Sequence, residues 1–241
     1  MLDALGTILA TTAIAVGLVA FFTAAPLRMS WRLGLAAGAG VWIGVAAAIA
    51  GSGALERLPI LLAVFTLPLA AAAGVTLISA AARAFLLALP LPLLIGLNLF
   101  RVGGLLFVLL ATVGRLAGPF PYFAGLGDFA TGLFAIPVAL LAARGPADGR
   151  RRIATWNAFG TLDLVLAIAL GITSRPGSAL QLIHAGVGSA AMTSLPWALV
   201  PTVLVPFFLL VHAIVFARLR GCASDKLSTC PMPPEGLGVA G

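Results

Sequence analysis

Apolar stretches of about 20 residues recur seven times along this 241-residue chain, separated by short segments that contain most of its arginines. A helix needs about 20 apolar residues to cross a hydrocarbon core roughly 30 Å thick. Soluble domains are about 45 to 50% apolar and about 25% charged, whereas 61% of this chain is hydrophobic and 9% is charged. A soluble fold cannot hide so much apolar surface. The sequence therefore predicts an all-α, polytopic membrane protein.

The predicted architecture is one up-and-down bundle of seven transmembrane helices, formed by residues 1–220 as a single domain. The predicted spans cover approximately residues 5–25, 33–51, 59–81, 91–113, 124–143, 153–173 and 197–218. The first span lacks the basic residues that open a signal peptide, so we expect a retained helix, although Thr23-Ala24-Ala25 resembles a weak cleavage site. Residues 174–196 form the longest loop, for which we expect a short helix on the membrane or folded back over the bundle. Residues 221–241 are rich in Gly, Pro and Ser and are predicted to be a disordered cytoplasmic tail.

Basic residues are distributed unevenly between the two sides of the predicted bundle. Ten of the fourteen Lys and Arg residues lie after spans one, three, five and seven, and three lie on the opposite side. The positive-inside rule then places the N-terminus outside and the C-terminus in the cytoplasm. A composition rich in Arg, Ala, Gly, Leu and Pro suggests a bacterial source, and hence the inner membrane. Because the arginines are scattered between apolar stretches, the formal charge of +7 does not indicate nucleic acid as a partner. The expected partner is the lipid bilayer.

Three charged residues, Arg101, Asp128 and Asp163, lie inside the predicted spans. An Arg or Asp near the centre of a bilayer costs about 2.5 to 3.5 kcal/mol on insertion scales, so such residues usually face one another, a cavity or a ligand. At about 1.5 Å per residue, Arg101 and Asp163 lie at similar depths and can pair directly. Asp128 lies about 5 to 8 Å nearer the outside, within reach of a long Arg side chain or of one bridging water.

Uncharged polar side chains accompany these charges. Asn98 shares a helix face with Arg101, Asn157 shares one with Asp163, and His212 lies at about the depth of Asn157. Together they predict a polar column from the middle of the membrane to its inner side. One Arg between two Asp leaves a formal charge of −1, which can hold a proton or a small cation.

The leading hypothesis is a membrane protein that binds or translocates a small solute or a proton through a polar pocket between spans four to seven. Arg101 acts in it as anion anchor or counter-ion, and Asp128 and Asp163 act as proton or cation acceptors. The remaining candidates, Asn98, Asn157 and His212, line the pathway. The alternative is a structural or partner-binding subunit whose buried ion pairs only fix helix packing, at about 0.6 kcal/mol for each interhelical contact. A second alternative is a membrane-embedded enzyme.

Several sharper readings lack the residues they need. No predicted span contains a Lys, so a retinal Schiff base is excluded. His184 and His212 are the only histidines, which is too few for paired haem ligation. A zinc enzyme needs about three strong ligands and an open position, and the candidate ligands lie at different predicted depths. Phosphate-binding and serine-hydrolase motifs are missing from the sequence. The sequence thus assigns no catalytic residue, no metal ligand and no cofactor.

Four motifs carry a family resemblance. They are Asn98-x-x-Arg101-x-x-Gly104-x-x-Phe107, Phe123-Ala124-Gly125-x-Gly127-Asp128-x-x-x-Gly132, Trp156-Asn157-x-x-Gly160-x-x-Asp163, and Pro201 with Pro206 before His212. This pattern, over residues 91–220, resembles a family of uncharacterised bacterial seven-span membrane proteins. Members of that family often have Gln at the position of Asn98. The resemblance implies a seven-helix membrane fold, and it implies no activity because none is assigned to the family.

Overall fold

The computed structural model describes residues 1–24 and 29–224, and within these ranges the chain is all-helical with no strand. Seven of the described helical segments are long and apolar enough to cross a membrane. These segments are Leu2–Ala20, Arg32–Gly51, Leu58–Ile78, Leu91–Thr112, Phe120–Ala143, Gly149–Thr173 and Val200–Gly221. The chain is therefore an all-α protein with seven candidate spans. The last helix extends to Ser224, so most of the predicted tail lies outside the described residues.

The elements follow one another along the chain with few long interruptions. In order they are α1 (Leu2–Thr23), α2 (Met29–Gly51), η1 (Ala54–Glu56), α3 (Leu58–Ile78), α4 (Ala80–Ala88), α5 (Leu91–Gly96), η2 (Leu97–Gly104), α6 (Leu105–Thr112), α7 (Phe120–Ala143), α8 (Pro146–Thr173), η3 (Ala190–Thr193), η4 (Val200–Leu204) and α9 (Val205–Ser224). The fourth candidate span is composite, because α5, a 3₁₀ segment η2 and α6 succeed one another without a break. The seventh begins with a π-helical turn, η4, before α9.

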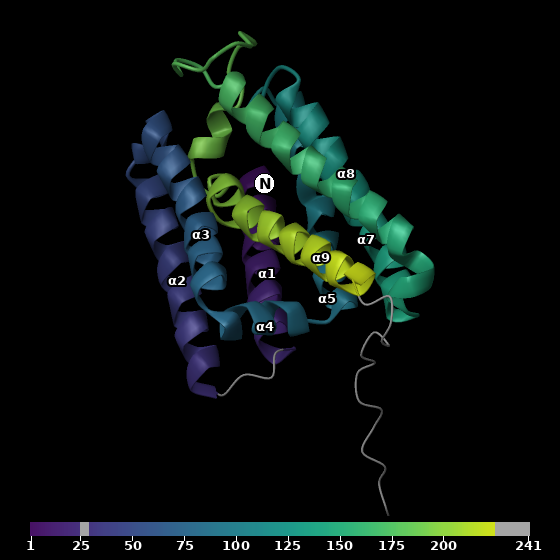
Figure 1. The fold of residues 1–241 in the computed structure, drawn as a ribbon. Coiled ribbons are helices and arrows are strands. Elements are labelled where there is room, and N and C mark those ends of the chain that lie inside the picture. Colours follow the sequence, from purple (N-terminus) through teal and green to yellow (C-terminus); the bar gives the residue numbers. More distant parts are fainter. Residues whose placement is uncertain (25–28, 225–241) are drawn as a thin grey trace, which may run out of the picture.

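Two groups of helices are bridged by α9. Figure 1 shows α2 and α3 on one side and α7 and α8 on the other, with α9 crossing between them. Helices α7 and α8 pack along each other, and α7 also packs on α5, η2 and α6. On the opposite side, α3 packs on α9 and η4. Spans four to seven therefore form the more closely packed part of the bundle.

The short helix α4 is an element that the sequence analysis did not predict. Its N-cap is Ser79, whose side chain accepts a hydrogen bond from the backbone N–H of Ala82 at 3.1 Å. Such a cap satisfies one of the donors left free at a helix start. Figure 1 shows α4 lying across one end of the bundle. Arg218 of α9 holds its C-terminal end, donating to the carbonyls of Leu87 and Leu89.

The loop of residues 174–196 differs from the expectation of a helix. Apart from the four-residue η3, it consists of turns and extended backbone. Its chain folds back on the end of α8, where the N–H groups of Leu182 and Ile183 donate to the carbonyl of Thr173. The hydroxyl of Ser189 donates to the carbonyl of Gly171 at 2.6 Å. These local bonds satisfy the backbone without a helix.

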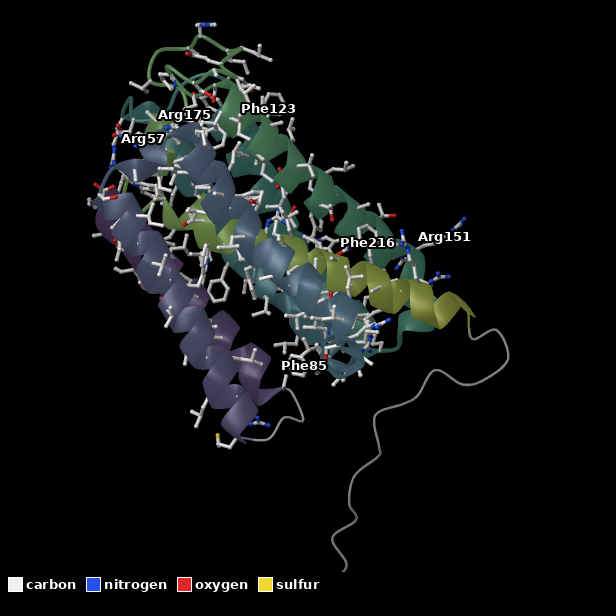
Figure 2. All side chains as sticks on the ribbon, turned by 60° about the vertical axis from the view of Figure 1, so that its left-hand side comes forward. Arg57, Phe85, Phe123, Arg151, Arg175 and Phe216 are labelled. Carbon is white, nitrogen blue, oxygen red and sulfur yellow. The ribbon has the colours of Figure 1, made fainter. Side chains whose placement is uncertain are left out.

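Helix α8 begins at Pro146, several residues before the predicted start of span six. The basic run from Arg150 to Arg152 is thus helical rather than part of a loop. Arg150 donates from Nε to the carbonyl of Leu219 at 3.1 Å, which ties α8 to the end of α9. Figure 2 shows Arg151 at one end of the bundle, with Arg57 and Arg175 at the other.

Apolar side chains form separate cores above and below the middle of spans four to seven. One core, including Leu94, Ile153 and Val211, lies toward the end that carries α4. The other, including Phe107 and Phe120, lies toward the loop of residues 174–196. The polar side chains of the predicted site occur between the residues that form these cores. They are therefore separated from both ends by packed apolar groups.

Candidate functional site

Arg101 is placed by the 3₁₀ segment η2. A 3₁₀ helix has three residues per turn, so side chains at i and i+3 eclipse one another. Asn98, Arg101, Gly104 and Phe107 are accordingly all buried, whereas Leu99 and Leu105 between them are exposed. The spacing of the first motif is the period of this segment. It directs Arg101, which is only 3% exposed, into the bundle.

The guanidinium of Arg101 uses all of its donors within the protein. Its Nε donates to Oδ1 of Asp128 at 2.6 Å, and its Nη2 donates to Oδ2 of Asp163 at 2.5 Å. Both Nη atoms also donate to the carbonyl of Gly160 at 3.2 Å. The fifth contact joins Nη1 to Nε2 of His212 at 2.9 Å. Since a guanidinium has five N–H groups, Arg101 has no donor left for a ligand.

Asp128 and Asp163 differ in their surroundings although they share one guanidinium. The side chain of Asp163 is 5% exposed, whereas that of Asp128 is 14% exposed. The pairing of Arg101 with Asp163 follows the prediction of similar depth, and Asp128 contacts Arg101 directly rather than through a water. With both carboxylates ionised, the three side chains carry a formal charge of −1.

His212 and Asn157 interlock through reciprocal bonds. Because Arg101 can only donate, Nε2 of His212 accepts, and the imidazole proton resides on Nδ1. Nδ1 lies 2.7 Å from Oδ1 of Asn157, and Nδ2 of Asn157 donates to the carbonyl of His212 at 3.1 Å. His212 is therefore neutral and fixed in one tautomer. Through His212, Asn157 is therefore connected to Arg101 and its two carboxylates.

Two glycines of the motifs make this close assembly feasible. A Cβ at Gly104 would lie 2.5 Å from Cβ of Asp128 and 2.8 Å from the carbonyl oxygen of Gly125. A Cβ at Gly160 would lie 2.7 Å from Cε1 of His212. Such separations are too short for van der Waals contact. The missing side chains let η2, α7, α8 and α9 approach until their polar groups meet.

Asn98 does not join the cluster by any hydrogen bond found among the described residues. Its Nδ2 donates to the carbonyl of Leu94 in the preceding turn at 3.2 Å, and its buried Oδ1 has no partner in the described part of the chain. The buried hydroxyl of Thr131 is likewise unpaired there. Asn98 thus stands one 3₁₀ turn away from the cluster that it was predicted to line.

Residues outside the predicted set also enclose the cluster. The Trp156 ring lies 5.5 Å from that of His212, centroid to centroid, and its Nε1 donates to the carbonyl of Thr131 at 3.0 Å. Phe208 places its ring 5.8 Å from Cζ of Arg101, in cation–π range. Neither Trp156 nor Phe208 was among the candidate site residues. The place of Trp156 beside Asn157 in a motif, and the i, i+4 spacing of Phe208 and His212, are the signals that identify them.

Two cavities reach this cluster. A cavity of about 50 Å³ is lined by Arg101 and Asp128 and, from α1, by Gly6 and Leu9. A second cavity, of about 170 Å³, is also lined by Asp128 and extends to Arg175. The smaller volume exceeds the 10 to 15 Å³ that a water needs. Asp128 is the charged residue common to both cavities, whereas Arg101 lines only the smaller one.

The first helix contributes to the site as well as to the fold. Its Asp3 accepts hydrogen bonds at Oδ1 from Arg115 at 2.5 Å and from Nε1 of Trp197 at 2.7 Å. These contacts hold α1 against the loop after α6 and the start of the last span. The predicted pocket between spans four to seven therefore also involves the first span, because α1 lines the smaller cavity.

No group of three or more His, Cys, Asp or Glu side chains within residues 1–24 and 29–224 is arranged to hold a metal ion. Arg101 lies between Asp128 and Asp163 and contacts His212, so a cation already occupies the centre that these side chains share. The arrangement suits proton exchange at a carboxylate better than coordination of a divalent ion, which takes six or more oxygen ligands or an octahedral shell.

The geometry brings together residues from three of the motifs, namely Arg101, Gly104, Asp128, Asn157, Gly160 and Asp163, and a family model covers the same region. No curated protein and no solved structure matches the chain. One family model matches residues 58–220, which includes α3 as well as the part from residue 91 onward that carries the motifs. Because the match covers more than half of the sequence, the chain belongs to the family described as Domain of unknown function (DUF8737).

Proposed function

We propose that this chain is a multi-pass protein of the bacterial inner membrane that binds a proton at Asp128 and exchanges it through the adjoining cavities. Its N-terminus lies outside and its C-terminus lies in the cytoplasm. The observation that carries the proposal is the sharing of one guanidinium by two buried carboxylates, of which one faces both cavities.

The orientation is supported by the basic residues. Arg151 and Arg152 lie at the start of α8, at the end of the bundle that also carries Arg218 and α4. Arg57 and Arg175 lie at the other end (Figure 2). An excess of Lys and Arg marks the cytoplasmic side of membrane proteins.

Charge balance favours a proton over an anionic solute. An anion at Arg101 would have to displace one of the five contacts that the guanidinium now makes. A proton requires no displacement, because adding it to one carboxylate brings the formal charge of the cluster from −1 to zero. Asp128 is the better site, since its side chain is more exposed than that of Asp163. A membrane-embedded enzyme has no comparable support.

Infrared difference spectroscopy tests the proposed proton. Spectra of the purified protein are compared between acid and alkaline pH, and the C=O band of a protonated carboxyl group is followed. We expect a band that disappears in Asp128→Asn and persists in the control Asp3→Asn, whose carboxylate pairs with Arg115 at the bundle end. Liposomes that contain a pH indicator then report whether the wild-type protein admits protons and whether Asp128→Asn does not. A band that survives in Asp128→Asn would contradict the proposal.

A labelling experiment tests the orientation separately. Cys222 and Cys230 are first replaced by Ala, and single cysteines are then introduced as Arg57→Cys and Arg151→Cys. A membrane-impermeant maleimide is expected to label intact cells at position 57. Position 151 is expected to react only after permeabilisation. The reverse pattern would invert the assigned topology without affecting the proton site.

The second candidate function is structural, and the saturation of Arg101 favours it. A guanidinium with five internal partners, beside an interlocked His212 and Asn157, fixes the register of four elements. On this reading the infrared band is missing from the wild-type protein. The joint replacement of Arg101→Met with Asp128→Leu and Asp163→Leu, which removes all three charges, then leaves folding intact, as hydrophobic replacement of a buried ionic triad often does.

A further inference from the structure

Arg175 is a buried cation that lacks a partner for part of its guanidinium. It follows the end of α8 and is only 6% exposed. Its Nη2 donates to the backbone carbonyl of Glu56. Its Nη1 is buried and has no hydrogen-bond partner among the described residues. A buried donor without a partner destabilises the folded state, and more so when it is charged.

Among the described residues, no carboxylate forms an ion pair with this cation. The ion pairs found within the described ranges join Arg101 and Arg115 to aspartates, and none of them includes Arg175. Burial lowers the pKa of the Arg175 guanidinium from its ordinary value, although the negative charge of Glu56 acts in the opposite direction. The site is therefore electrostatically suited to an anion.

Arg175 lines the 170 Å³ cavity, whose walls are mostly apolar and also include Asp128 and three hydroxyl side chains. Along α8 the lining runs from Leu164 to Arg175, which corresponds to about 16 Å at 1.5 Å per residue. The facing wall comes from α3, at Leu61, Leu62 and Phe65. A long, mostly apolar slot with a cation at its end suits a ligand that has an extended alkyl chain and an anionic head group.

The hydroxyl groups that line the cavity are already hydrogen-bonded, so Arg175 is the side chain that can donate to a ligand there. Thr66, Ser189 and Thr193 each donate their hydroxyl proton to a backbone carbonyl. Nη1 of Arg175 is therefore the donor still unpaired among the described side chains that line the slot. This NH₂ group, with two N–H donors, suits a small acceptor such as a carboxylate.

We propose that this slot binds a single-chain fatty acid, whose carboxylate pairs with Arg175 and whose alkyl chain lies between α3 and α8. Helix α3 packs on α9 and η4, and the slot lies between α3 and the helices α7 and α8. The fatty acid enters from the bilayer between α3 and these two helices. The carboxylate replaces the missing partner of Nη1, and the apolar side chains of the slot accommodate the alkyl chain. This inference rests on Arg175 and not on protonation of Asp128, although both residues line the same cavity.

The test uses the full-length protein in lipid nanodiscs and dodecanoate that carries a diazirine at its terminal carbon. Irradiation is expected to label α3 or α8 within the slot. Unlabelled dodecanoate is expected to compete, whereas dodecanol, which has the same chain and no charge, competes roughly ten- to a hundredfold more weakly. Hexanoate, which keeps the carboxylate on a shorter chain, is expected to compete poorly. Equal competition by dodecanol, or labelling outside the slot, overturns the proposal.

Matched variants separate the head from the chain. Arg175→Gln is expected to weaken dodecanoate binding about tenfold or more, and Arg57→Gln, an exposed arginine in the neighbouring turn, is expected to leave it unchanged. Ala167→Phe fills the slot and abolishes labelling, whereas Ala169→Phe points away from the bundle on the same helix and does not. Unchanged binding in Arg175→Gln overturns the proposal. Should that variant fail to fold, the dodecanol comparison on the wild-type protein still decides.

The infrared band assigned to Asp128 is expected to persist in Arg175→Gln. A failure of the fatty-acid site is thereby distinguishable from a failure of the proton site.

Discussion

Nη1 of Arg101 lies 2.9 Å from Nε2 of His212, and because of this contact His212 does not take up a second proton. An imidazole nitrogen that accepts from a guanidinium cannot itself hold a proton. A second proton on His212 would place two cations in contact in a buried site, at a cost of several kcal/mol. Changes of charge in the cluster are therefore confined to its two carboxylates.

Replacement of the aspartates is expected to be non-additive. Asp128→Asn alone costs about 1 kcal/mol or less of unfolding free energy, because Asp163 still compensates Arg101. The double variant Asp128→Asn/Asp163→Asn leaves a buried guanidinium without a carboxylate and costs about 3 to 5 kcal/mol. Thermal or denaturant unfolding of the four proteins in detergent measures the coupling. Additive losses would show that the carboxylates do not share one charge.

Removal of Arg101 is expected to change how stability depends on pH. In Arg101→Gln the two carboxylates face each other without a cation, which costs about 3 to 5 kcal/mol at neutral pH. Protonation of either carboxylate relieves the repulsion in the folded state. The folded state then binds more protons than the unfolded state, so stability rises as pH falls. Unfolding temperatures measured from neutral to mildly acid pH test the sign, and a variant whose stability falls with acid contradicts it.

A methyl group at Gly160 is expected to disrupt the cluster. The Cβ of Gly160→Ala would lie 2.7 Å from Cε1 of His212 and 2.9 Å from Cγ2 of Thr131. Displacement of the imidazole removes its contact with Arg101, so we expect a loss of about 1 to 3 kcal/mol. Gly44→Ala in α2 is the control, because no side chain or distant backbone atom lies within 4 Å of its Cβ. Equal effects in the two variants would mean that only helix propensity is being measured.

Two buried polar residues near the cluster are expected to respond in opposite ways. Thr131→Val removes a hydroxyl that has no partner among the described residues, so stability is unchanged or slightly raised. Asn157→Leu leaves Nδ1–H of His212 without its acceptor, removes the side-chain bond to the His212 carbonyl, and is expected to cost about 2 kcal/mol. Unfolding free energies in one detergent provide the comparison. A loss in Thr131→Val as large as that in Asn157→Leu would indicate an unrecognised partner of the hydroxyl, such as an ordered water.

Part of this site follows from the sequence because the bilayer makes buried charge so costly. That rule identifies Arg101, Asp128 and Asp163 as mutual partners before any coordinates exist. It fails for Asn98, because an uncharged amide can satisfy itself within its own helix, and its Nδ2 does so at Leu94. The pattern of charges therefore predicts partners more reliably than the pattern of amides.

The depth estimates fail where the helix is not an α-helix. Counting 1.5 Å per residue to Arg101 ignores the 3₁₀ rise of about 2.0 Å, which moves the residue about 2 Å further toward Asp128. The helix α4 was missed because its apolar residues continue the preceding stretch, and only Ser79 and Pro90 mark its ends. Phe208 is apolar, so its sequence position did not mark it as a site residue. Its place over the Arg101 guanidinium is visible only in the structure.

The 3₁₀ segment η2 changes the rotation of α6 relative to α5 within the fourth candidate span. Each of its eight residues turns about 120° where an α-helix turns about 100°, so α6 is rotated by about 160° relative to an uninterrupted helix. The same eight residues lengthen the fourth span by about 4 Å relative to an α-helix. Conversion of η2 to α-helical geometry would thus rotate Arg101 away from the helix face that it shares with Asn98 and Gly104. It would also shorten the span. A change of winding in eight residues is all that is needed to uncouple the guanidinium from its carboxylates.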